Sequence, residues 1–117
     1  MAIEHYHAIL WIDQHQAEIY HFSRDDAQLH AMKEHGHRDA IYFREVAEPL
    51  GDAGAILLTG PAYTKLEFQK YLEDHHPTLA GRVTGVETMD HPTNPQLVAF
   101  GRHYFKSADL NTPQIAI

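Results

Sequence analysis

The chain has 117 residues, is 44% hydrophobic and carries a formal net charge of −7 with neutral histidines, which favours one folded domain, residues 1–117, with a substantial core. Cysteine is absent, so disulfides and thiolate chemistry are excluded. The acidic balance disfavours bulk attraction to phosphate backbones, and no apolar segment approaches the length of a membrane span. We therefore expect a soluble, cytoplasmic protein that binds no membrane.

The first part of the chain predicts three short strands. The strand candidates lie at 7–12, 17–23 and 27–32, and two of them alternate between apolar and polar residues. The polar segments between them are short, which favours an antiparallel meander.

Helices and strands alternate in the middle of the chain. Apolar residues at helical spacing between 43 and 50 predict a first helix. Four consecutive apolar residues at 55–58 predict a strand covered on both faces, which a Gly-Pro turn at 60–61 ends. Thr64, followed three residues later by a glutamate, predicts a capping box for a second helix that Pro77 limits.

The end of the chain predicts one more strand and one more helix. Residues 83–89 are the strand, while Asn94 and Pro95 supply the cap and first turn of the last helix. The inner face of this helix is expected to hold Leu97, Phe100, Gly101 and Tyr104, and residues 110–117 are expected to form a tail. The complete order, β-β-β-α-β-α-β-α, predicts an α/β fold of the ribonuclease H-like type, with a mixed five-stranded sheet and helices on both faces.

One segment resembles a known family. Ile56-Leu57-Leu58-Thr59-Gly60-Pro61-Ala62-Tyr63-Thr64-Lys65, with Phe68 and Tyr71-Leu72 after it, has the strand, turn, aromatic, lysine and phenylalanine spacing of the central domain of Pelota and of archaeal and eukaryotic class-one peptide-chain release factors. Residues 7–22, 83–87 and 97–100 resemble the opening hairpin, the closing strand and the closing helix of that domain. The chain is also similar to small bacterial proteins often labelled translational machinery proteins. The resemblance implies a role in translation.

The catalytic motif of the release factors is missing from this sequence. Those factors hydrolyse peptidyl-tRNA with a Gly-Gly-Gln loop between the third strand and the first helix. Here that interval, residues 34–40, reads Glu-His-Gly-His-Arg-Asp-Ala, and the chain contains no Gly-Gly-Gln. The resemblance therefore implies a non-catalytic protein, without the flanking domains of a complete factor, that binds the ribosome or another translation component.

The turn after the buried strand and the 34–40 interval form the candidate contact surface. Free amides at a helix start, together with Lys65, suit a phosphate group or an RNA backbone, although an ordinary connector with a solvated lysine has the same pattern. The candidate binding residues are Gly60, Pro61, Tyr63, Thr64, Lys65, His35, His37 and Arg38. The glycine-rich pattern of a nucleotide-binding loop is absent, so no cofactor or small-molecule substrate is expected.

Two further hypotheses stay open. A metal-dependent nuclease of the ribonuclease H type would use Asp13, Glu45 and Asp90 as magnesium ligands, whereas Asp13 and Asp90 are also typical turn residues. His35 and His37 are the first candidates for a metal ion such as zinc, with solvated loop histidines as the alternative, and a homo-oligomeric scaffold would use its histidines to sense metal or pH. The balance favours a protein that is not an enzyme.

Overall fold

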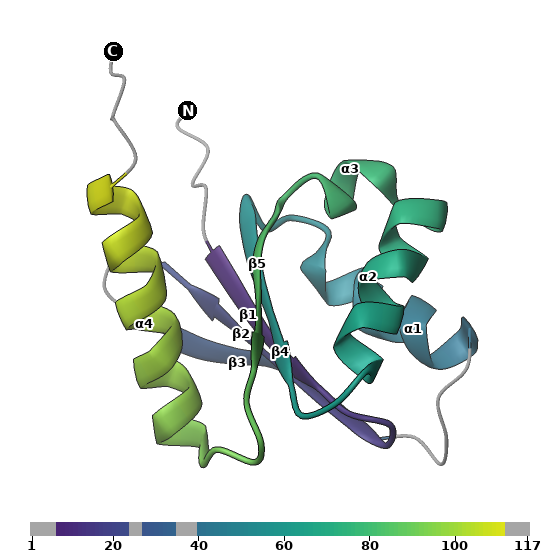
Figure 1. Cartoon of the computed structure of the whole chain (residues 1–117), viewed down its shortest axis with the longest axis horizontal. Coiled ribbons are helices and arrows are strands. Elements are labelled where there is room, and N and C mark those ends of the chain that lie inside the picture. Colours follow the sequence, from purple (N-terminus) through teal and green to yellow (C-terminus); the bar gives the residue numbers. More distant parts are fainter. Residues whose placement is uncertain (1–6, 24–26, 35–39, 112–117) are drawn as a thin grey trace.

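The computed structural model describes residues 7–23, 27–34 and 40–111, which form a sheet with helices on both faces (Figure 1). The elements in chain order are β1 (His7–Ile12), β2 (Gln16–Phe22), β3 (Ala27–Glu34), α1 (Ala40–Ala47), the 3-10 helix η1 (Glu48–Leu50), β4 (Ala55–Gly60), α2 (Thr64–His75), α3 (Pro77–Ala80), β5 (Val83–Thr88) and α4 (Asn94–Asn111). Among these described residues, no helix is both long enough and apolar enough to cross a membrane.

The strands follow the order β3-β2-β1-β4-β5 across the sheet. The first three are antiparallel neighbours, as the short turns predict, while β1 pairs with β4 and β4 with β5 in parallel. β4 therefore lies between two parallel neighbours, and Ile56, Leu57 and Leu58 are fully buried. The predictions of a mixed α/β fold and of a strand covered on both faces are confirmed.

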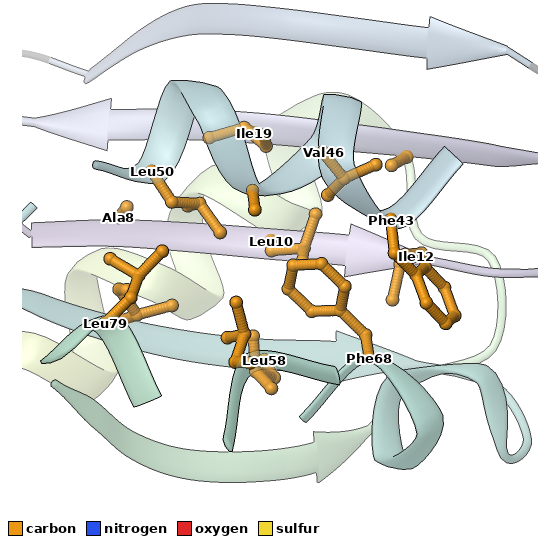
Figure 2. Close-up of a cluster of buried hydrophobic side chains, with 14 of the residues drawn as sticks. Ala8, Leu10, Ile12, Ile19, Phe43, Val46, Leu50, Leu58, Phe68 and Leu79 are labelled. Atoms are coloured by element: carbon orange, nitrogen blue, oxygen red, sulfur yellow. The ribbon is translucent and has the colours of Figure 1, made fainter. Parts of the chain in front are cut away.

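Alternation along β1 divides the core into two layers. Ala8, Leu10 and Ile12 pack against side chains of α1, α2 and α3, of which Figure 2 shows Phe43, Phe68 and Leu79 among others. Ile9 and Trp11 pack on the opposite side, against side chains of β2 and α4. Figure 1 shows this arrangement, with α4 on one side of the sheet and α1 to α3 on the other. Each fully buried aliphatic or aromatic side chain stabilises the fold by about 1.5–3 kcal/mol, so both helical layers are held mainly by burial.

Two helix boundaries differ from the predicted ones, and one short helix was not predicted. α1 begins at Ala40, ahead of the predicted segment, which brings Tyr42 into the core as its largest fully buried side chain. α2 ends at His75, before Pro77, as predicted; Pro77 itself begins the short helix α3, which was not predicted, because proline is suited to the first position of a helix. α4 ends at Asn111, so it includes the first two residues of the segment that was expected to be a tail, and residues 112–117 lie outside the described part.

The predicted helix caps are also corrected. Thr64 is the first residue of α2, and Tyr63 takes the cap position without a side-chain hydrogen bond, so the predicted capping box is wrong. A capping box occurs instead at the start of α4. The Thr93 N–H donates to Gln96 Oε1 at 2.8 Å, and the Gln96 N–H donates to Thr93 Oγ1 at 3.2 Å. The cap therefore belongs to Thr93, one residue before the predicted Asn94.

Candidate functional site

Gly60 ends β4 at a point where two backbones come unusually close. Its φ is +153°, and a Cβ atom built on it would lie 2.1 Å from the carbonyl oxygen of Ile12 in β1. Only glycine combines that backbone angle with such a close approach at low cost. Gly60 also accepts a hydrogen bond at 3.0 Å from the N–H of Met89, which follows β5. The glycine thus holds the carboxyl ends of β1, β4 and β5 together.

Lys65 does not present its charge to solvent. The residue is 5% exposed, and its Nζ donates to the carbonyl oxygen of Ala62 at 2.5 Å, three residues back. Thr64 beside it is equally buried. The lysine closes the β4–α2 turn from inside because its flexible stem can fold back onto a carbonyl that the turn leaves free. The structure therefore corrects the prediction of a lysine that reaches an anion from this turn.

The residue that the same turn does expose is aromatic. Tyr63 is 74% exposed, and Leu66 in the first turn of α2 is 45% exposed. Ala62 between Pro61 and Tyr63 is also exposed, so residues 61–63 and Leu66 form an apolar projection, here called the Tyr63 tip. The Tyr63 carbonyl accepts hydrogen bonds from the N–H groups of Leu66 and Glu67, which fixes the projection to the start of α2.

The second predicted contact segment, with His35, His37 and Arg38, lies outside the described residues. Its predicted roles in binding and in metal coordination therefore stay predictions. α1 begins at Ala40, directly after this segment. The rings of Phe43 in α1 and Phe68 in α2 have centroids 5.5 Å apart, so the segment leads into a helix that packs beside the helix of the Tyr63 tip.

Asp13 has the geometry of a turn residue. Its Oδ1 accepts hydrogen bonds from the N–H groups of His15 and Gln16, both at 2.8 Å, and its own N–H donates to the Gln16 carbonyl. These bonds form the turn between β1 and β2. Oδ2 lies 3.7 Å from Nε2 of His91, whose Nδ1 lies 3.0 Å from Oδ1 of the exposed Asp90.

The nuclease hypothesis requires carboxylates that converge on metal ions. Asp13 and Asp90 both approach His91. Glu45 is an exposed residue of α1, which packs on the face of the sheet opposite to α4. Among the described residues, no group of three or more histidines and carboxylates could hold a metal ion. The predicted set of Asp13, Glu45 and Asp90 is therefore wrong as a metal centre.

A pocket beside Trp11 was not predicted. It is lined by Trp11, Gln16, Glu18, His91, Pro92 and Leu97. The Trp11 indole N–H donates to the carbonyl oxygens of Met89, at 3.2 Å, and Asp90, at 3.0 Å, which anchors the ring under the β5–α4 connection. The rings of Trp11 and His91 have centroids 5.0 Å apart.

Glu18 is the unusual residue of this pocket. It faces the same side of β2 as Tyr20 and Phe22 and pairs with Trp11 across the sheet. Burial raises the pKa of the Glu18 carboxyl above its ordinary value. Burial and the negative charge of Glu18 together raise the pKa of Tyr20. The sequence carried one signal of this site, a glutamate in the apolar stripe of a strand.

Comparison with known proteins identifies solved structures with a similar fold. No family model and no curated protein matches the sequence. Among solved structures, the chain is similar to Archaeoglobus fulgidus Pelota, with a TM-score of 0.70, 17% identity and coverage of 84% of this chain and 31% of that chain. It is also similar to the archaeal translation termination factor aRF1, with a TM-score of 0.61, 14% identity and coverage of 91% and 40%. Saccharomyces cerevisiae Dom34, described as a translation termination-like factor involved in RNA quality control pathways and interacting with Hbs1, gives a TM-score of 0.62, 12% identity and coverage of 92% and 36%.

The predicted resemblance to Pelota and the release factors is thus confirmed at the level of the fold. The chain spans between 31% and 40% of the length of these three structures. At such low sequence identity, the likeness establishes a shared architecture and leaves function to be argued from the residues.

Proposed function

We propose that this chain is a non-catalytic, translation-associated protein that binds the ribosome or another translation component. The observation that carries the proposal is the likeness of its fold to Pelota and aRF1 over 84% and 91% of its length. The absence of Gly-Gly-Gln from the sequence supports a role without release catalysis. We also assign the fold to the ribonuclease H-like type, because an antiparallel meander is followed by β4 and β5 in the sheet order 3-2-1-4-5.

Within the predicted turn Tyr63 is open to a partner, and Leu66, which was not among the predicted contact residues, enlarges this exposed surface. Tyrosine offers a large apolar area and a hydroxyl group at a small entropic cost, and it is enriched among residues that dominate binding energy. Tyr63 and Leu66 are both well exposed, whereas the neighbouring Thr64 and Lys65 are buried and act within the turn. We assign the contact to Tyr63 and Leu66, together with the 34–40 segment and its His35, His37 and Arg38.

Co-sedimentation with ribosomal subunits tests the proposal directly. Wild-type protein is expected to sediment with one subunit or with whole ribosomes. Tyr63→Ala is expected to weaken that binding by about tenfold or more, the size that loss of a central aromatic contact gives. Glu73→Ala is the matched control, because Glu73 is an exposed residue nearer the other end of α2 and its loss should leave binding unchanged.

The two parts of the proposal fail separately. If the wild-type protein stays in the supernatant in extracts of both growing and stationary-phase cells, ribosome binding is refuted. If the wild type sediments and Tyr63→Ala sediments equally well, the tip is not the contact surface. Equal unfolding temperatures of Tyr63→Ala and the wild type are expected, because a side chain that is 74% exposed contributes little to the core.

A further inference from the structure

Glu18 lines the pocket beside Trp11, and one oxygen of its carboxylate has no hydrogen-bond donor in the fold. Oε1 of Glu18 is shielded from solvent and has no hydrogen-bond partner among the described residues. A buried carboxylate oxygen in this condition is costly, and natural proteins retain such groups when a ligand, a water molecule or a proton completes them. The raised pKa of Glu18 has the same origin, since burial penalises its charged form.

The size of the pocket restricts what can complete Glu18. Its free volume is about 30 Å³, which corresponds to about two water-sized groups. A planar guanidinium group has four heavy atoms, so it fits that space less well than a smaller cation does. A terminal –CH₂–NH₃⁺ group has two, and its three N–H donors can serve a carboxylate and a carbonyl at once.

The walls of the pocket also favour a cation. The Trp11 ring lines it, and indole is the aromatic group that attracts cations most strongly. The carboxylates of Asp13 and Asp90, which are not lining residues, lie 3.7 Å and 3.0 Å from the two nitrogens of the lining residue His91, so acidic groups surround the one titratable base of the pocket. The net charge of −7 of the whole chain adds a long-range attraction for positive ligands.

We propose that this pocket binds a primary ammonium group, with Glu18 as the hydrogen-bond acceptor and counter-ion and Trp11 as the aromatic wall. A free alkylamine and the tip of a lysine side chain from another protein present the same chemistry to it. The proposal concerns the α4 side of the sheet and is independent of the Tyr63 tip.

The chain contains one tryptophan, so its fluorescence reports this pocket alone. We would titrate the full chain with butylammonium chloride at constant ionic strength and use 1-butanol as the neutral control. Wild-type protein is expected to show a saturable change in Trp11 emission with butylammonium and none with butanol. Glu18→Gln, which keeps the size of the side chain and removes its charge, is expected to bind at least about tenfold more weakly, as loss of a charge-assisted hydrogen bond implies.

Three results would overturn the proposal: a response that does not saturate, an equal response to butanol, or equal affinities of wild type and Glu18→Gln. Amide shifts of Gln16 and Leu97 in NMR spectra of the wild type provide a readout that needs no variant, and their absence during the butylammonium titration would also refute it. A parallel titration with Nα-acetyl-lysine methylamide distinguishes the sources. Binding at least as tight as that of butylammonium supports a protein lysine, and much weaker binding supports a free amine.

Discussion

Replacement of Gly60 by alanine tests whether the β4–α2 turn requires a glycine where it approaches β1. The added Cβ would lie 2.1 Å from the Ile12 carbonyl oxygen, and the atom it meets belongs to a backbone that is paired on both sides in the sheet. The φ of +153° is a second obstacle, because side chains other than glycine rarely adopt it. Neither obstacle can be relieved by rotating a side chain.

The expected cost follows from these two terms. A residue held in an unfavourable backbone region costs about 1–3 kcal/mol, and overpacking of a rigid core costs about 1–3 kcal/mol more. We therefore expect Gly60→Ala to lower the free energy of unfolding by about 2–6 kcal/mol. For a chain of 117 residues, about 1 kcal/mol corresponds to a shift in Tm of about 4 °C, so the variant should melt about 8–24 °C below the wild type.

Circular dichroism melts of three proteins measure this effect. Gly51→Ala is the matched control: Gly51 has a helical φ of −57°, and the nearest atom to its added Cβ would be the Glu48 carbonyl oxygen at 3.4 Å. That variant should melt at or slightly above the wild-type temperature, since alanine reduces the entropy of the unfolded chain. A Gly60→Ala protein that melts within about 2 °C of the wild type would refute the assigned backbone geometry.

Two further changes test the cap of α4 and the buried hydroxyl of Tyr42. Thr93→Ala should lower the free energy of unfolding by about 1 kcal/mol in urea titrations, whereas Asn94→Ala should cost clearly less, because the reciprocal bonds to Gln96 belong to Thr93; equal costs would contradict this cap. Tyr42→Phe removes the hydrogen bond from the phenol to the Asp13 carbonyl, 3.0 Å long, and should cost about 1 kcal/mol at pH 7. Burial and the charge of Asp13 raise the pKa of Tyr42, so its contribution is complete below the ordinary tyrosine pKa of about 10 and declines as pH rises above it. The stability difference between wild type and Tyr42→Phe should therefore shrink between pH 9 and pH 11, and a constant difference would contradict the burial of the phenol.

Much of the fold follows from local patterns that need no tertiary information. Alternation predicts the strands of the meander, and the unbroken apolar run at 55–58 predicts a strand covered on both faces. The burial of Tyr42 could not be predicted, because its hydroxyl finds its partner 29 residues away, at Asp13. Similarly, the choice between Thr93 and Asn94 as the cap depends on a backbone geometry that both residue types suit.

The site was less predictable than the fold because its chemistry depends on where the folded chain places its charged side chains. In the sequence Lys65 follows a turn, a position where a lysine is usually solvated. In the structure its side chain folds back onto the Ala62 carbonyl. Trp11 and Glu18 belong to different strands, and the residues that complete their pocket, His91 and Leu97, come from the far end of the chain. The pairing of β1 with β2, the packing of α4 and the hydrogen bonds from Trp11 to the β5–α4 connection bring these four residues together.

The segment that most resembles the translation factors is used mainly for folding. Thr59 donates its buried hydroxyl to the Leu10 carbonyl at 2.8 Å, Gly60 permits the approach of β1, Lys65 closes the turn and Phe68 fills the core. Each of these residues acts inside the chain, so their spacing is explained by the strand-turn-helix geometry without reference to a binding partner. The spacing is therefore evidence for the fold, and the exposed Tyr63 is the residue of this segment to which we assign the proposed contact with a translation component.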